Sequence, residues 1–529
     1  MKPSRKPPHS VLTRIAGLMG AFAAVLLWHA PLLRLPYFWD EAGYYVPAAL
    51  DFFRHGALIP QSTLPTGHTP VVSVYLALAW RVFGWSPLVT RAAMSLVAAA
   101  TLVSLYALAR EVFPDDRLRA PGKPDPNPHE MACWSSVLLA VSPLFFAQTT
   151  LAHLDLTAAL FTTLAALFLL QRRLAMFAIA AALAALSKET AIVIVPVAAL
   201  LWRQEPEGTS RVTPRLSRAR FSLALACPLV ALADWAFYYH HSTGYWTGNA
   251  EYLQYNLYST LSPARILLSL ARRLYEVLVG GFNWVLLAGA VLGGWRARKG
   301  TAGNRAAENR FREFALLAAG LSAVYVLMLS VVGGAILPRY LLPIFPLLYL
   351  AAVALIWRLP RAPARIILLA AAACFVSAWF INPPYPFPYE DNVAYADFVQ
   401  LHQQAAKFLE SNAARLKIAT AWPASDELGK PELGYVSSPL VVQPMNGFAS
   451  DDFARLRSDA FDLLYLYSRE WDPPSNWLRR FPFLLATQQR YFAYAPQLAR
   501  STVVDRYHLK LIAHFERRGQ WVRIYGKGG

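Results

Sequence analysis

The sequence has few charged residues and few cysteines. Only 16% of its 529 residues are Asp, Glu, Lys or Arg, whereas a soluble globular chain carries about 25%. The three cysteines, Cys133, Cys227 and Cys374, all lie inside apolar runs, so no disulfide framework is expected. The sequence also lacks Asn-x-Ser/Thr, His-Glu-x-x-His and Gly-x-Ser-x-Gly. These absences argue against a glycosylated secretory protein and against a protease.

Long apolar runs stand where the charged residues are missing. A bilayer core about 30 Å thick needs about 20 apolar residues per helix, and the backbone groups inside it must be satisfied within that helix. The sequence therefore predicts an α-helical polytopic membrane protein. We expect eleven transmembrane helices, near residues 11–33, 89–109, 132–150, 155–171, 173–187, 190–202, 221–239, 276–294, 314–332, 340–357 and 364–381.

Positive charge is concentrated between these runs. The net charge is +18, and 33 of the 50 basic residues but only 17 of the 32 acidic residues precede residue 382. Basic residues in short loops are a topology signal, so we do not expect nucleic-acid binding. They predict an inner-membrane, multi-pass protein with a cytoplasmic N-terminus and an extracytoplasmic C-terminal domain. The apolar segment 71–83 is too short to span, and we expect it to lie on the outer surface as a helix.

The composition changes after residue 381. A Pro-rich stretch at 383–388 is followed by a more charged sequence, with a helical pattern over 394–410. Short β-rich runs follow at 417–422, 440–443, 462–467, 509–515 and 521–525. The pattern predicts a membrane module over residues 1–381 and a small α/β outer domain over residues 382–529.

Several charged residues fall at the predicted outer ends of the spans. Charges near hydrocarbon are costly and need a structural or functional reason. On the predicted topology they lie together at or just under the outer interface. They are Asp40, Glu41, Asp155, Lys188, Glu189, Asp234 and Arg339.

The pair Asp40-Glu41 is surrounded by aromatic residues. A solvated loop within an interfacial aromatic belt is one interpretation. The other is a reaction site, because a positioned carboxylate can take the proton from a hydroxyl group. In that case Trp39 and Tyr44 offer flat apolar faces against which a sugar ring can lie.

Four sequence segments in a fixed order resemble a known family. The first is Asp40-Glu41 after the first span. The second is His68-Thr69-Pro70, which is followed by an amphipathic segment and then by Arg91. The third is the turn at 186–191 that contains Lys188, and the fourth is Arg339-Tyr340-x-x-Pro343 at a late span. This order is similar to that of the GT-C fold polytopic glycosyltransferases. The closest resemblance is to the protein O-mannosyltransferase and lipid A aminoarabinose transferase group, and it covers about residues 11–381.

The resemblance implies transfer of a hexose or pentose from a polyprenyl-phosphate carrier to a hydroxyl of a lipid, glycan or protein acceptor. Such enzymes invert the anomeric centre by direct displacement. The implied catalytic residues are Asp40, Glu41 and Asp155, with Asp40 as base. Arg339, Lys188 and Tyr340 would hold the donor phosphate, and His68, Tyr44 and Trp39 would bind substrate. No cofactor is expected, and a metal held by His68, His153, His240 and His241 is the less favoured alternative because they form no tight ligand motif.

Each site residue also has a structural interpretation. Arg339 could extend its charge to the interface at a helix end, Lys188 could pair with Glu189, and Asp155 could cap the helix that follows it. The aromatic loop 240–275 could be a lid or an interfacial belt.

Two other functional classes fit a polytopic chain. A lipid or sugar transporter would place polar groups and broken helices near the bilayer midplane, whereas the middles of these spans are Ala, Leu and Val. A non-catalytic envelope assembly subunit would tolerate replacement of Asp40. The charges at one rim favour an enzyme.

Overall fold

The computed structural model describes residues 11–113, 128–203, 218–298, 305–472, 480–492, 494 and 497–527. Contacts between residues divide the chain into two compact units. The helical unit comprises Met1–Ala30, Pro65–Leu76 and Ala92–Ala378, and the mixed unit comprises Pro31–Leu64, Ala77–Arg91 and Trp379–Gly529. The mixed unit thus joins the first loop to the C-terminal residues. The boundary expected at residue 381 remains a prediction.

The helical unit consists of helices along the described chain. They are α1 (Val11–Trp28), α5 (Pro128–Val141), α6 (Pro143–Gln148), α7 (Leu154–Leu170), α8 (Leu174–Ser187), η3 (Glu189–Val193), α9 (Ile194–Arg203), α10 (Arg218–Thr243), α11 (Ala250–Asn256), η4 (Tyr258–Thr260), α12 (Pro263–Leu278), η5 (Gly280–Phe282), α13 (Asn283–Arg298), α14 (Arg305–Val331), η6 (Pro338–Ile344), α15 (Phe345–Ile356) and α16 (Arg361–Ala378). Two further helices, α3 (Val71–Phe83) and α4 (Pro87–Val112), are each divided between the two units.

Six helical stretches in the described chain are long and apolar enough to cross a membrane, and several shorter apolar helices accompany them. Every predicted span overlaps one or more helices, and the helix expected over 71–83 is α3. The prediction of a polytopic helical membrane protein is therefore confirmed in outline. The number of crossings and their orientation remain predictions.

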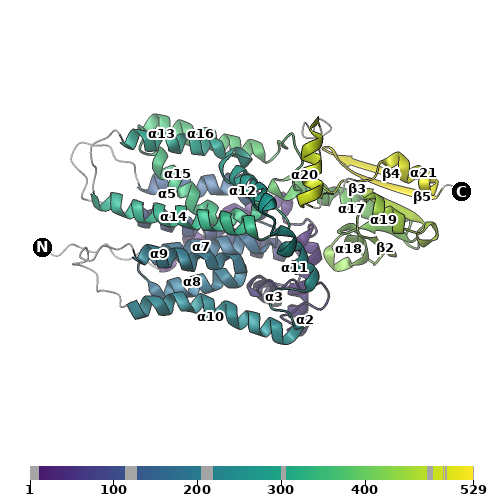
Figure 1. Cartoon of the computed structure of the whole chain (residues 1–529), viewed down its shortest axis with the longest axis horizontal. Coiled ribbons are helices and arrows are strands. Elements are labelled where there is room, and N and C mark those ends of the chain that lie inside the picture. Colours follow the sequence, from purple (N-terminus) through teal and green to yellow (C-terminus); the bar gives the residue numbers. More distant parts are fainter. Residues whose placement is uncertain are drawn as a thin grey trace. The chain divides into compact units, whose positions relative to one another are not determined.

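Helices α7 and α8 form an antiparallel pair, with α10 packed against α8 (Figure 1). The connection between α7 and α8 is short, and Arg172 within it adopts the left-handed conformation, with φ 58°. A short helix–helix connection gives antiparallel neighbours. As a result, the start of α7 and the end of α8 lie at the same end of the pair.

The segment 240–275, expected to be a loop, is largely helical. It contains the end of α10, all of α11 and most of α12. Helix α12 buries Arg265, Ser269, Arg273 and Glu276 and exposes Leu267 and Leu274. A helix with its charges inside and its leucines outside suits lipid surroundings, where apolar side chains face outward. The loop prediction was wrong because arginines dilute the apolar signal of this helix.

The span expected over 276–294 is interrupted at Gly281. This residue has φ 59°, a conformation that glycine adopts without strain, and it separates α12 from α13. The described helix of this region therefore begins at Asn283 rather than at Glu276.

The mixed unit contains a five-stranded sheet of order β2-β1-β3-β5-β4. Its strands are β1 (Ile418–Ala421), β2 (Val442–Met445), β3 (Leu463–Tyr467), β4 (Leu509–Arg517) and β5 (Gln520–Lys527). Strand β1 pairs in parallel with β2 and β3, and β5 pairs antiparallel with β3 and β4. All five strands lie where the sequence predicted them.

Helices surround this sheet. Helix α17 (Ala394–Asn412) buries Phe398, Leu401, Ala405 and Leu409, which is the spacing of one helix face. The other helices of the mixed unit are η2 (Glu41–Tyr45), α2 (Val46–His55), η7 (Tyr389–Asp391), α18 (Ala424–Gly429), η8 (Pro431–Leu433), α19 (Ser450–Arg455), η9 (Ser458–Ala460), α20 (Pro482–Phe492) and α21 (Arg500–Tyr507), and η1 (Ala30–Leu32) connects to α1. The prediction of a small C-terminal α/β fold is therefore confirmed.

Candidate active site

A buried cluster of charged residues lies at the shared end of α7 and α8. Asp155 is in the first turn of α7, and Lys188 directly follows α8. Lys188 Nζ donates a hydrogen bond to Asp155 Oδ1, and Arg339 Nε lies 3.8 Å from Asp155 Oδ2. Asp155 and Arg339 are fully buried, and Lys188 is 5% exposed. The antiparallel helix pair and η6 thus bring together three residues that are far apart in the sequence.

Three cations face the ring of Tyr340, which is partly exposed. Lys188 Nζ lies 3.7 Å from the ring centroid, Arg339 Cζ 5.4 Å and Arg273 Cζ 5.6 Å. A cation within about 6 Å of an aromatic face is attracted by its quadrupole. Tyr340 therefore organises the positive charge of this cluster.

Helix α12 fixes the backbone that leads into η6. Arg273 Nη1 donates to Leu337 O at 2.7 Å and contacts Glu276 Oε2 at 3.2 Å. Arg265 Nη2 donates to Gly334 O at 2.8 Å. Both arginines are buried, so α12 holds the segment before Arg339 by charged hydrogen bonds.

The structural alternatives for these residues are not realised. Arg339 is fully buried, so it does not extend to an interface. Lys188 pairs with Asp155, whereas Glu189 Oε2 lies 3.3 Å from His68 Nδ1. Asp155 does not cap α7, because His153 precedes the helix in the cap position. The negative charge of Asp155 instead lies in the first turn, where the helix dipole favours it.

His68 lies beside Glu189 and the ring of Tyr252, whose centroid is 5.7 Å from that of the imidazole. Burial raises the pKa of Tyr252 well above its ordinary value, so its hydroxyl stays protonated. Thr190, next to Glu189, shares a 3.0 Å hydrogen bond with Tyr325. His68 therefore contacts the same turn that carries Lys188.

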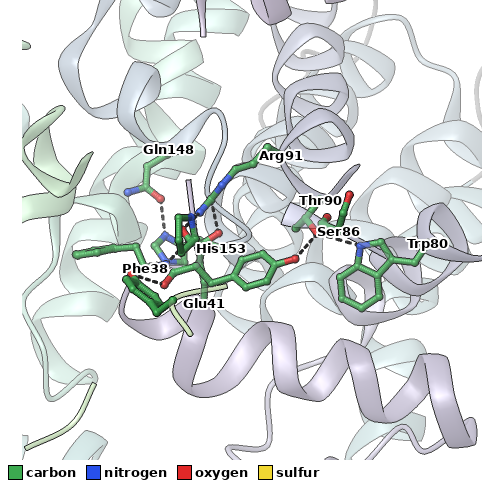
Figure 2. Close-up of polar contacts among 11 residues, drawn as sticks. Phe38, Glu41, Trp80, Ser86, Thr90, Arg91, Gln148 and His153 are labelled. Atoms are coloured by element: carbon green, nitrogen blue, oxygen red, sulfur yellow. Dashed lines mark hydrogen bonds and ion pairs between the residues drawn. The ribbon is translucent and has the colours of Figure 1, made fainter. Parts of the chain in front are cut away.

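In the mixed unit, Glu41 forms a second buried ion pair (Figure 2). Its Oε1 lies 2.6 Å from Arg91 Nη1, and its Oε2 accepts from Phe38 N at 2.9 Å. Arg91 Nη2 also donates to Pro36 O at 2.7 Å. Both charged side chains are fully buried. The pair anchors the loop that carries Asp40.

Next to this pair, Thr90 at the start of α4 forms polar contacts that reach Trp80 on α3 (Figure 2). Tyr37 shares a 2.8 Å hydrogen bond with Thr90, which also accepts from Trp80 Nε1 at 2.9 Å. Burial raises the pKa of Tyr37 to about 12, so its hydroxyl stays protonated in this network.

Trp39 and Asp40 lie in an unusual stretch of backbone. Trp39 has φ 44° although it is not glycine, and Asp40 precedes the π-helical turn η2. Strained residues and π-helical turns both concentrate at functional sites. Trp39, Asp40 and Tyr44 are each partly exposed.

The histidines proposed for a metal are held in different contacts. His153 Nδ1 lies 2.7 Å from Gln148 Oε1 (Figure 2), and the ring of His240 stacks on Trp246 at 4.1 Å. Among the residues that the structure describes, no group of three or more His, Cys, Asp or Glu could hold a metal ion. Asp234 is exposed on α10.

Sequence reasoning missed Arg265, Arg273 and Glu276 as part of the charged cluster. The available signal was their spacing, which places the three on one face of α12. Together with Ser269, they place a polar residue at every third or fourth position, which indicates a helix with an inward polar face.

No protein-family model and no curated protein matches the chain. The structure of ArnT from Cupriavidus metallidurans bound to undecaprenyl phosphate matches with a TM-score of 0.54 at 15% identity, covering 97% of either chain. Its apo structure gives a TM-score of 0.53 at 15% identity, covering 96% of this chain and 98% of that one. The arabinofuranosyltransferase AftD from Mycobacteria gives 0.44 at 15% identity, covering 99% of this chain and 40% of that one. The predicted resemblance to the GT-C group is confirmed at the level of the fold, and this chain has the fold of ArnT over nearly its whole length.

Proposed function

We propose that this protein is a membrane glycosyltransferase that moves a sugar from a polyprenyl-phosphate carrier to a hydroxyl acceptor on the outer face of the inner membrane. The observation that carries the proposal is the buried cluster of Asp155, Lys188 and Arg339 beside Tyr340. Buried charges at the end of apolar helices are expensive, and they generally mark a functional site.

The cluster suits a phosphate group. Arg339 offers a planar guanidinium that can grip two phosphate oxygens, and Lys188 acts as a compact point charge. Asp155 orients both cations through its two oxygens. The match in fold to a protein crystallised with undecaprenyl phosphate supports the same carrier class here.

The proposed reaction is a direct displacement. The acceptor oxygen forms a bond to the anomeric carbon while the bond from that carbon to the phosphate oxygen breaks. The leaving phosphate keeps the electron pair, and Lys188 and Arg339 stabilise its charge. Preorganised charges of this kind lower the barrier where charge develops. A single displacement inverts the anomeric centre, and a phosphate leaving group needs little general-acid assistance.

Asp40 is the proposed base, which takes the acceptor proton as the new bond forms. Glu41 serves as its positioning neighbour, since both of its oxygens are already engaged by Arg91 and Phe38. Trp39 and Tyr44 offer partly exposed rings for a sugar, and His68 contributes through the Lys188 turn.

The test is transfer of radiolabelled sugar by the purified full-length protein in lipid nanodiscs. The donors are undecaprenyl-phosphate pentoses and hexoses, and the acceptors are lipids, glycans and peptides with free hydroxyls. Asp40→Asn should lower the transfer rate by roughly 100- to 10,000-fold, because the amide cannot take a proton.

Asp234→Asn is the matched control, because Asp234 is an exposed carboxylate on α10. It should transfer at the wild-type rate. Equal rates for wild type and Asp40→Asn would remove Asp40 as the base. No transfer from any donor to any acceptor would favour the transporter or the assembly subunit.

A further inference from the structure

We infer that Trp422, contributed by the C-terminal residues, is a positioning residue that holds the Asp40 loop in its reactive conformation. The contact lies entirely within the mixed unit. The inference rests on the proposed function for the role of Asp40, and it gives the C-terminal fold a part in the reaction.

Trp422 packs against the residues on either side of Asp40. Its ring centroid lies 5.3 Å from that of Trp39, edge to face, and 5.8 Å from that of Tyr44. Between these contacts, a Cβ atom added to Gly43 would lie 2.6 Å from the indole of Trp422. The indole therefore covers the backbone of η2 so closely that only glycine fits at position 43.

The loop needs such support because its backbone is strained. Positive φ brings the Cβ of a non-glycine residue too close to the backbone, and Trp39 adopts φ 44°. A π-helical turn follows it. Conformations of this kind persist only where the surroundings determine them strongly. Trp422 contacts both parts of this strained stretch.

Trp422 is itself fixed by the sheet. It directly follows β1, which lies between β2 and β3 in the strand order. Tyr467 on β3 donates its hydroxyl to Trp422 O at 2.6 Å. Phe398 on α17 packs against Trp39 at 5.7 Å and against Tyr467 at 5.9 Å. Because the sheet fixes the position of the indole, the indole restricts the motion of the loop that it contacts.

Further hydrogen bonds connect the same two parts of the mixed unit. Tyr435 donates its hydroxyl to Tyr37 O at 3.0 Å, and Tyr37 N donates to Leu433 O at 3.3 Å. Burial raises the pKa of Tyr435, so its hydroxyl remains a donor. These bonds hold the start of the loop, whereas Trp422 contacts the turn around Asp40.

A positioning role makes a kinetic prediction that differs from acceptor binding. If the indole only holds Asp40, its loss lowers kcat and leaves the KM for the acceptor unchanged. Small misplacements of a reacting group reduce rates by up to roughly 100-fold. If the indole instead bound the acceptor, its loss would raise KM.

The experiment compares Trp422→Leu with wild type in the full-length protein. Hydrogen–deuterium exchange is measured on peptides covering residues 37–45, where Glu41 N and Gly43 N donate to the backbone oxygens of Phe38 and Trp39. Trp422→Leu should exchange at least about tenfold faster there, and kcat should fall about 10- to 100-fold.

Trp521→Leu is the control, because Trp521 is a partly buried tryptophan of the same sheet that packs on Arg523. It should leave exchange at 37–45 and kcat unchanged. Wild-type exchange in Trp422→Leu would overturn the inference, as would a raised KM with unchanged kcat.

A double-mutant cycle with Gly43→Ala tests the contact itself. Gly43→Ala should displace the indole and lower kcat on its own. In the Trp422→Leu background the added methyl group meets no indole, so it should cause little further loss. Fully additive effects would contradict the contact.

Exchange and sugar transfer together distinguish a failure of the Trp422 contact from a failure of the proposed glycosyltransferase function. Faster exchange in Trp422→Leu, together with no sugar transfer by wild type, would retain the positioning contact and reject the glycosyltransferase. Wild-type exchange together with normal transfer would reject the contact and retain the glycosyltransferase.

Discussion

Two buried carboxylate–cation pairs, Glu41–Arg91 in the mixed unit and Asp155–Lys188 in the helical unit, differ in what surrounds them. Glu41 and Arg91 are both fully buried, and they also form hydrogen bonds with the backbone of Phe38 and Pro36. Asp155 and Lys188 are almost as deeply buried, but Arg339 and the partly exposed ring of Tyr340 accompany them.

The difference separates a structural pair from a candidate binding site. A pair whose hydrogen bonds go to its own loop fixes that loop. A group of cations around a partly exposed ring can receive an anion, which is the chemistry that a carrier phosphate needs. Substitutions of Glu41, of Arg339, of Tyr340 and in an exposed pair test this distinction.

The largest effect is expected from Glu41→Ala. It leaves the guanidinium of Arg91 buried without its carboxylate, which destabilises a protein by about 3–5 kcal/mol. We expect a markedly lower Tm by intrinsic fluorescence and loss of monodisperse protein in gel filtration. Replacing both residues by methionine should recover much of the Tm. An unchanged Tm for Glu41→Ala would show that the pair does not anchor the loop.

Arg339→Met should reduce sugar transfer rather than stability. Removing a preorganised charge from the developing phosphate lowers kcat by roughly 100- to 1000-fold. The labelled-sugar assay measures this, with gel filtration to confirm folding. Arg365→Met is the matched control, because Arg365 forms an exposed ion pair with Glu130. If both variants transfer normally, the Asp155 cluster is as structural as the Glu41 pair.

Tyr340→Leu should have a smaller effect. It removes the ring that the three cations share, and such contacts contribute about 0.5–2 kcal/mol, which corresponds to a loss of about 2- to 30-fold in transfer rate. Tyr340→Phe keeps the ring and should transfer at close to the wild-type rate. A large loss in Tyr340→Phe would instead assign a role to the hydroxyl.

The smallest effect is expected at the exposed pair of Arg457 and Asp459 in the mixed unit. A hydrogen bond from Arg457 lowers the pKa of Asp459, yet both side chains are exposed, where ion pairs contribute little. Asp459→Asn should leave the Tm unchanged. A clear fall in Tm would mean that this exposed ion pair stabilises the fold as much as a buried ion pair does.

Much of the fold follows from hydropathy and spacing. Each predicted strand lies within two residues of an observed one, and α3 occupies the predicted 71–83 segment. The predicted proximity of Asp155, Lys188 and Arg339 also follows from topology, because antiparallel helices bring the ends of neighbouring spans together. These features depend on local pattern and helix length, which a sequence displays directly.

The sequence does not show which charged residues form ion pairs with one another. Lys188 has Glu189 beside it but pairs with Asp155, because Asp155 lies on the adjacent helix. Glu41 pairs with Arg91, 50 residues away. Such pairs depend on tertiary packing. The assignment of the first loop and the C-terminal residues to one unit is likewise a property of three-dimensional contacts.

Whether the Asp155 cluster holds the carrier phosphate is tested by binding of undecaprenyl phosphate to the full-length protein, measured by native mass spectrometry from nanodiscs. Wild type and Arg365→Met should bind it equally, and replacing Lys188 and Arg339 together by methionine should weaken binding at least about tenfold, a change of about 1.4 kcal/mol. Equal binding by all three proteins would contradict the assignment of this cluster to the carrier phosphate.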